Sequence, residues 1–355
     1  MIYLRFIFLI LFFIISGCDS KSNSMQPDNL EQENSSWVFV ANEGGFGGID
    51  DGTLTMIDNL GNIIETDILG DTVQSLAVYD NKLIVSVFDN QKLLIFDISE
   101  SGISNMQEIL TDESSPRELI VLDDKLYFGA WDPDYNVYLY EPGNIKVLDL
   151  KTLNIDNPIF ETIPVGIMPE GMLFDSNYLW VANSGENTIS KIDISNNTLA
   201  QTIEVGNGPQ NLVLHNNDIY ISRYFWDPVN YNNTYGSSKI SGNDVTNVDY
   251  SSGVVCGGAV LNYNNQVYRS TSGGIAPVSE NLNLNQSERI GNYNPDKVYH
   301  VEIIDNNIWF GMQVLDNNGW IVNEPGTIKI VDQHGMELSS FEAGINPGDF
   351  AIWNK

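Results

Sequence analysis

Residues 37–355 predict an all-β fold, a seven-bladed β-propeller with four antiparallel strands in each blade. Three observations carry this prediction. A pattern of short runs rich in β-branched and aromatic residues recurs seven times, each copy is about 46 residues long, and Asn, Gly, Asp and Pro separate the runs. Helical periodicity does not accompany the pattern, so no helical layer is expected.

The clearest copy is residues 178–214, in which turn residues separate four runs. Its first run, Leu179–Ala182, recurs at Val38–Ala41, Leu83–Ser86, Leu126–Gly129, Ile219–Ser222, Val267–Ser270 and Ile308–Gly311. Its last run, Leu212–Leu214, recurs at Leu76–Val78, Leu119–Val121, Met172–Phe174, Val260–Asn262, Val301–Ile303 and Phe350–Ile352. Four strands in a repeat of this length are typical of a propeller blade.

The phase of the repeat predicts how the ring closes. The pattern begins at Val38 with the second strand of a blade and finishes at Phe350–Trp353 with a strand of the innermost type. We therefore expect the C-terminal strand to complete the first blade, which removes an open sheet edge.

The N-terminal residues predict export. Arg5 precedes a ten-residue apolar run, Phe6–Ile15, which is too short to span a bilayer, so residues 1–17 are predicted to be a signal peptide. Ile15-Ser-Gly-Cys18 resembles the lipobox of bacterial lipoproteins, which implies a lipid on Cys18 and a membrane anchor. Residues 18–36 are polar and predict a flexible tether. We expect an outer-membrane location, on the surface or the periplasmic side.

The net charge argues against a nucleic-acid partner, and the cysteine content argues against an internal disulfide. The formal net charge is −31, which repels phosphate backbones, so nucleic acid is not an expected partner. The chain has two cysteines, and with Cys18 lipidated an internal disulfide is not available.

The clearest copy also resembles a known family. Leu179-Trp-Val-Ala-Asn183, Ile189-Ser-Lys-Ile-Asp193 and Ile203-Glu-Val-Gly-Asn-Gly-Pro-Gln210 resemble the YVTN-type repeat of bacterial β-propellers. The segments Asn42–Asp58 and Leu69–Ser75 resemble a family of Bacteroidota surface lipoproteins, over essentially residues 37–355. The resemblance implies that corrinoid capture beside an outer-membrane transporter is one function within this group.

Insertions are expected to gather on one face of the ring. Blades 3, 5 and 7 have long aromatic loops between strands two and three, and Trp-Asp-Pro occurs in two of them. Either these loops only cap the blades, or they form a ligand-binding face. The predicted ligand-binding residues are Arg117, Glu118, Trp131, Tyr135, Glu170, Gln210, Arg223, Tyr224, Trp226, His300 and Trp320. For Arg117, pairing with Glu118 or Glu170 between blades remains an equal alternative.

Oxygen ligands in the same loops predict a structural calcium ion, with Asp132, Asp134 and Asp227 as its ligands. Repeated aspartates at the ends of third strands are instead expected to form turns, and they are Asp58, Asp97, Asp149, Asp193 and Asp332. Of the three histidines, His300 alone is expected near the channel, while His215 and His334 are expected in turns of the opposite face.

The sequence therefore predicts a lipoprotein that captures a ligand and is not an enzyme. The favoured ligand is a corrinoid or similar nutrient for a TonB-dependent transporter. One alternative is a protein-interaction scaffold. Another is a lyase or glycan-active enzyme, for which Glu170 and His300 are the acid–base pair that can be named.

Overall fold

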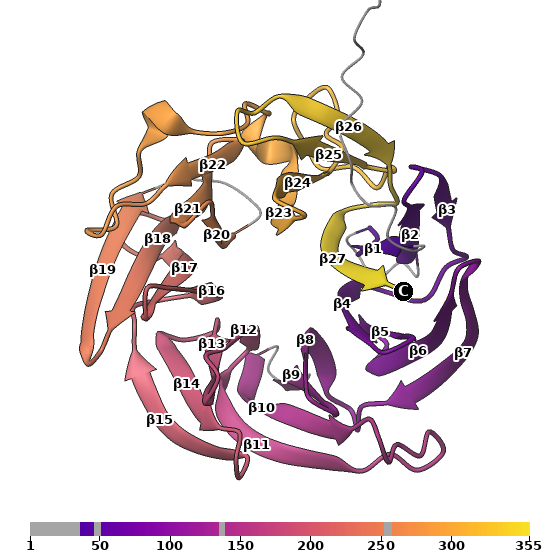
Figure 1. Ribbon diagram of the computed structural model, residues 1–355. Coiled ribbons are helices and arrows are strands. Elements are labelled where there is room, and N and C mark those ends of the chain that lie inside the picture. Colours follow the sequence, from indigo (N-terminus) through magenta and orange to yellow (C-terminus); the bar gives the residue numbers. More distant parts are fainter. Residues whose placement is uncertain (1–35, 46–50, 135–138, 252–257) are drawn as a thin grey trace, which may run out of the picture. The chain divides into compact units, whose positions relative to one another are not determined.

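The computed structural model describes residues 36–45, 51–134, 139–251 and 258–355. These residues form seven antiparallel sheets arranged in a ring, which confirms the seven-bladed β-propeller (Figure 1). The predicted signal peptide at 1–17, Cys18 and the predicted tether apart from Ser36 lie outside the described residues. No helix in the described part of the chain is long and apolar enough to cross a bilayer.

From the inner to the outer strand, the first three blades are β27 (Pro347–Asn354), β1 (Ser36–Asn42), β2 (Thr53–Asp58) and β3 (Ile63–Glu65); β4 (Val73–Tyr79), β5 (Lys82–Val87), β6 (Lys92–Ser99) and β7 (Gly102–Leu110); and β8 (Ser115–Leu122), β9 (Lys125–Asp134), β10 (Leu139–Asp149) and β11 (Phe160–Ile167). The fourth and fifth blades are β12 (Pro169–Phe174), β13 (Tyr178–Asn183), β14 (Thr188–Asp193) and β15 (Thr198–Glu204); and β16 (Pro209–His215), β17 (Asp218–Asp227), β18 (Asn232–Ser241) and β19 (Asp244–Ser251). The last two are β20 (Val260–Tyr263), β21 (Gln266–Thr271) and β22 (Gly274–Pro277), followed by the 3₁₀ turns η1 (Gln286–Glu288) and η2 (Pro295–Lys297); and β23 (Val298–Ile304), β24 (Asn307–Met312), β25 (Thr327–Val331) and β26 (Glu337–Glu342).

The first blade is closed as predicted. Strand β27 pairs with β1 in antiparallel register, with Trp37 opposite Trp353 and Val40 opposite Phe350. The sixth blade differs from the others, because its described sheet has three strands. Two isolated bridges, Ile275 to Ile290 and Val278 to Leu284, lie where the other blades have their outer strand.

The core is divided among the blade junctions. The described residues form seven hydrophobic clusters, and each cluster joins side chains of two neighbouring blades. Strand β13 shows how the pattern arises. Leu179 and Val181 pack toward blade 3, whereas Trp180 and Ala182 pack toward blade 5. Because successive side chains of a strand point to opposite faces, a strand buried on both faces has the continuous apolar run seen in the sequence.

Candidate functional site

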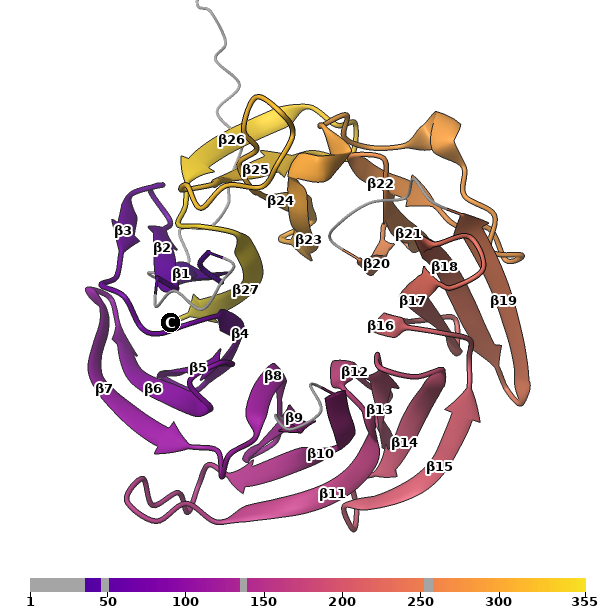
Figure 2. The ribbon, with the colours of Figure 1, turned by 180° about the vertical axis from the view of Figure 1, so that it is seen from behind.

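Six of the seven inner strands change register near their first residues. Shifts occur between Val73 and Ser75 in β4, between Pro116 and Leu119 in β8, and between Pro169 and Met172 in β12. The starts of β16, β23 and β27 have the same irregularity. A bulge re-aims the side chains beside it. Here the side chains at these positions reach the central channel of the ring, seen from both sides in Figures 1 and 2.

The channel contains a cavity of about 700 Å³. Its charged side chains are mostly acidic. They are Glu43, Arg117, Glu118, Glu170, His300, Glu302 and Asp349. Gln74, Gln210 and Tyr299 add neutral polar groups to the same wall. A cavity with this lining favours ligand groups that donate hydrogen bonds or carry positive charge.

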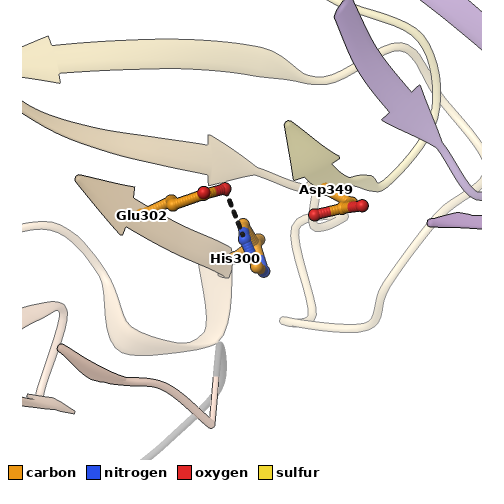
Figure 3. A group of neighbouring side chains, drawn as sticks. All are labelled: His300, Glu302 and Asp349. Carbon is orange, nitrogen blue, oxygen red and sulfur yellow. Dashed lines mark ion pairs between the residues drawn. The ribbon is translucent and has the colours of Figure 1, made fainter. Parts of the chain in front are cut away.

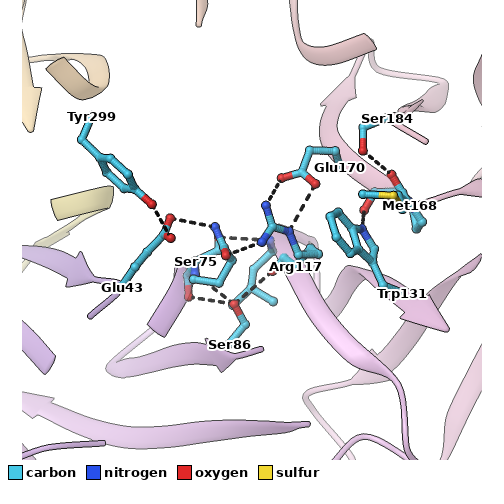
Figure 4. A network of polar contacts seen from close by, with 12 residues as sticks. Glu43, Ser75, Ser86, Arg117, Trp131, Met168, Glu170, Ser184 and Tyr299 are labelled. Carbon is cyan, nitrogen blue, oxygen red and sulfur yellow. Dashed lines mark hydrogen bonds and ion pairs between the residues drawn. The ribbon is translucent and has the colours of Figure 1, made fainter. Parts of the chain in front are cut away.

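Arg117 is the centre of one polar network in this wall (Figure 4). Its Nε and Nη2 donate to the two carboxylate oxygens of Glu170 at 3.2 and 2.5 Å, and its Nη1 donates to Gln74. Gln74 in turn donates to Glu43 at 3.1 Å, and the hydroxyl of Tyr299 donates to the other oxygen of Glu43 at 2.5 Å. The network joins several blades around the channel. Arg117 therefore pairs with Glu170 between blades, which was the alternative to a purely ligand-binding role for Arg117.

Aromatic rings hold the guanidinium of Arg117 in place. Its central carbon lies 4.6 Å from the ring centre of Trp131 and 5.1 Å from that of Phe88. The indole of Trp131 is buried and donates a 2.8 Å hydrogen bond to the carbonyl of Pro169. Stacking of this kind favours the charged guanidinium and fixes its orientation.

A second group in the channel wall consists of His300, Glu302 and Asp349 (Figure 3). His300 Nε2 lies 3.6 Å from Glu302 Oε2. Burial raises the pKa of Asp349 to about 7, and the neighbouring Glu302 carboxylate adds to this effect. Burial and the charge of Asp349 likewise raise the pKa of Glu118 well above its ordinary value. The channel therefore concentrates carboxyl groups that resist ionisation.

An aromatic groove adjoins the channel across blades 3, 4 and 5. It encloses about 660 Å³ and is lined by Trp131 and Glu186 as well as Tyr224, Phe225 and Trp226. Four side chains line both the groove and the channel cavity, and they are Arg117, Glu170, Gln210 and Tyr224. The groove thus leads from an aromatic surface, where Trp226 is 56% exposed, to the acidic interior.

The structure brings most of the predicted ligand-binding residues together. Arg117, Glu118, Glu170, Gln210, Tyr224 and His300 line the channel cavity, and Trp131 and Trp226 line the groove. The predicted long loops of blades 3 and 5 are extensions of the hairpins β9–β10 and β17–β18. Trp320 lies in the blade 7 loop and is 73% exposed, while its neighbour Ile321 reaches the channel cavity. Tyr135 lies outside the described residues.

Arg223, a predicted ligand-binding residue, lines neither the channel cavity nor the groove. Gly236 is its cross-strand partner on β18 and has no side chain, which leaves room for the guanidinium to cross that strand. The guanidinium donates to the carbonyl of Val248 at 3.2 Å and pairs with the Asp249 carboxylate. Arg223 is 2% exposed and joins strands within blade 5.

The predicted calcium ligands that the structure describes have protein partners. Asp132 accepts hydrogen bonds from Ser114 and Asn144, both at 2.8 Å. Asp227 accepts two backbone N–H groups and the side-chain amide of Asn230 in its own turn. In the described part of the chain, the group with metal-ligand geometry is instead His300, Glu302 and Asp349. A calcium ion at the predicted position stays a prediction.

Sequence reasoning missed Glu43 and Glu302 as members of the site. Glu302 lies two residues after His300 on β23, so the two-residue period of a strand could have placed both on one face. Glu43 follows the first strand, and its contacts with Gln74 and Tyr299 span 31 and 256 residues of sequence. A local sequence pattern does not predict contacts between residues so far apart in the sequence.

Neither a family model nor a curated protein matches this sequence. Solved structures do match its fold. A candidate 6-phosphogluconolactonase from Bacteroides fragilis is 14% identical, with a TM-score of 0.60 over 92% of this chain and 100% of that one. A dihydro-heme d1 dehydrogenase is 11% identical, with a TM-score of 0.56 over 89% and 75%. A streptogramin B lyase is 14% identical, with a TM-score of 0.50 over 88% and 98%.

These similarities correct one prediction. The sequence analysis expected a binding protein and not an enzyme, but the propellers similar to this chain include proteins named as a dehydrogenase and a lyase. The expectation that this chain is not an enzyme is therefore wrong as an inference from its sequence and fold. At 11–14% identity the likeness shows the fold alone, so no particular reaction follows from it. The finer resemblance to YVTN-type repeats and surface lipoproteins stays a prediction.

Proposed function

We propose that this chain binds a small molecule that extends from the aromatic groove into the acidic channel. The observation that carries the proposal is the continuity of the two cavities at Arg117, Glu170, Gln210 and Tyr224. Pockets that combine apolar and aromatic walls with a few fixed polar groups are typical ligand sites. Rigid strands position these polar groups, so the site needs little ordering when the ligand arrives.

The lining indicates the chemistry of the ligand. In the channel, the positive charge of Arg117 is already engaged by Glu170, and the other acidic side chains supply no positive charge in either protonation state. Phosphate and carboxylate groups are therefore poor candidates for the channel end, whereas amide, hydroxyl and ammonium groups fit it. In the groove, Trp226 and its neighbours favour a flat apolar body.

A corrinoid satisfies both requirements, since its macrocycle is broad and its peripheral amides donate hydrogen bonds. The sequence resemblance supports the same choice, together with a lipid anchor at Cys18 and delivery to an outer-membrane transporter. The corrinoid ligand, the lipid anchor and the transporter are parts of the proposal. The channel lined by acidic side chains is the part that rests on the geometry of the described residues.

Calorimetric titration with cobalamin tests the corrinoid version. We expect saturable binding tighter than about 10 μM, which corresponds to roughly −7 kcal/mol. Trp226→Ala should weaken this binding at least tenfold, because the exposed ring lines the groove. Met336→Ala is the control, since Met336 is also exposed and lines neither the groove nor the channel cavity. Equal affinities of the two variants would argue against the groove, and absent binding would remove the corrinoid.

A second candidate function is turnover of the bound molecule. Glu118 lines the channel, and its raised pKa keeps the carboxyl protonated at higher pH than usual, so it can donate a proton to a bound substrate. One similar structure is named as a candidate lactonase, and an uncharged lactone suits the acidic channel. Hydrolysis of glucono-1,5-lactone, followed by titration of the acid released, tests this candidate. Glu118→Gln should abolish any turnover above the spontaneous rate, and an unchanged rate would exclude Glu118 as the proton donor.

A further inference from the structure

We propose that His300, Glu302 and Asp349 bind a divalent transition-metal ion in the channel wall. One imidazole nitrogen and two carboxylate oxygens, one from each residue, lie within 4.8 Å of one another. The proposal goes beyond the proposed function, because it concerns an inorganic ligand and three channel residues other than the four that join the groove to the channel. It stands or falls independently of the organic molecule.

Strands of two blades bring the three side chains together (Figure 3). His300 and Glu302 are two residues apart on β23 and therefore share one face, while Asp349 comes from β27 in the neighbouring blade. Asp349 Oδ2 accepts a 2.7 Å hydrogen bond from the backbone N–H of Leu76, and the His300 ring packs against Phe350 with centroids 5.6 Å apart. Two of the three side chains thus have a second contact that orients them, as ligand side chains of metal sites usually do.

Two buried atoms in this group have no hydrogen-bond partner. They are His300 Nε2 and Glu302 Oε2, which form an ion pair at 3.6 Å (Figure 3), a distance too long for a hydrogen bond. Buried polar atoms of side chains are almost always paired with protein, water or an ion. A cation bound by these two atoms and Asp349 would replace the long ion pair and give both atoms a partner.

The donor set indicates the class of metal. An imidazole nitrogen favours zinc, copper, iron and nickel over calcium and magnesium, which prefer all-oxygen sites. Ligands at about 2.1 Å from one ion lie roughly 3–4 Å apart, so small side-chain rotations suffice to close the group around an ion. Three protein ligands leave further positions for water or a ligand group, and these side chains line the channel cavity.

Titration of the full chain with ZnCl₂ and with MnCl₂ tests the proposal. Excess Mg²⁺ is present throughout, because a chain of net charge −31 has many weak surface sites that must be saturated first. We expect one site for each chain with a dissociation constant below about 10 μM for Zn²⁺. His300→Gln and Asp349→Asn should each weaken it at least thirtyfold. His334→Gln is the matched control, since His334 is exposed in a turn after β25 and should leave binding unchanged.

X-ray absorption at the zinc edge of the loaded chain adds a readout that does not depend on the variants. The proposal requires one imidazole and carboxylate oxygens around the metal, and it requires the imidazole signal to disappear in His300→Gln. A first shell of water alone, or of sulfur, would overturn it. Zinc binding of the same strength in wild type, His300→Gln and Glu302→Gln would overturn it as well, and circular dichroism establishes that each variant has folded.

Discussion

Carboxylates occupy two regions of this ring and behave in opposite ways. At the ends of third strands, Asp193 and Asp332 accept N–H groups of the following turn, and hydrogen bonds from Ser195 and from the backbone of Met336 lower their pKa values. In the channel, burial raises the pKa values of Glu43 and Glu118. The first group is stabilised as anions by donors, whereas the second group lacks enough donors and positive charge to offset burial.

The difference teaches how to separate structural from functional acids in a repeat protein. The turn aspartates recur from blade to blade because each blade needs the same turn, and Asp58 and Asp149 make equivalent contacts. Asp97 departs from this group, because it bonds the side chains of Lys82 and Asn105 instead. The channel acids Glu118, Glu170 and Asp349 lie in equivalent segments at the starts of inner strands, but the residue types in these segments differ from blade to blade. Such variation within a repeated segment is expected of a site that is used once in the ring.

Among the variants that test this comparison, Arg117→Met should produce the largest change in stability. It removes the cation that offsets the charge of Glu170 and interacts favourably with Glu43, so the unfolding free energy should fall by about 3 kcal/mol. Urea denaturation measures the change. Arg289→Met, at a partly exposed arginine of the blade 6 connection, should cost less, about 1 kcal/mol or below. If Glu170→Gln added to Arg117→Met recovers no stability, charge is not what makes Arg117 necessary.

Glu118→Gln should act in the other direction and raise the melting temperature by about 2–4 °C at pH 8. The folded-state pKa of Glu118 lies above its unfolded value, so the folded chain holds the extra proton. Stability from this group is therefore full below the unfolded pKa and is lost as pH rises through the folded pKa. The gain should vanish near pH 4, where wild type is protonated as well. Glu204→Gln, on the exposed face of β15, is the control.

Asp332→Asn should have the smallest effect, a decrease of about 1–2 °C in the melting temperature at pH 7. The folded-state pKa of Asp332 is lowered, so its contribution is present above the unfolded pKa and is lost as pH falls through the folded value. Melting curves at pH 7 and pH 3 measure this dependence. A loss that is as large at pH 3 as at pH 7 would mean that the ionised carboxylate is not what stabilises the turn.

Most of the fold could be predicted from the sequence, because recurring apolar runs and turn residues are local signals. The repeat phase also gave the closure of the first blade by β27. Arg117, Glu170 and His300 line the channel cavity because they lie at the starts of inner strands, and the repeat pattern locates these starts in the sequence. The partner of each side chain could not be predicted. The Arg223 side chain crosses β18 at Gly236, and Glu43 has partners in the two neighbouring blades, 31 and 256 residues away in sequence. Such pairings depend on register and bulges, which composition and periodicity do not determine.

The pairing of β27 with β1 has a consequence for synthesis. The strands of the other blades follow one another along the chain, so each of those sheets can assemble as its own residues emerge. The first sheet cannot, because residues 347–354 are made about three hundred residues after β1. Until then β1 keeps an unpaired edge that could recruit a strand from another molecule. Chaperones that shield extended segments are therefore expected to matter most for β1, from its synthesis until β27 has paired with it.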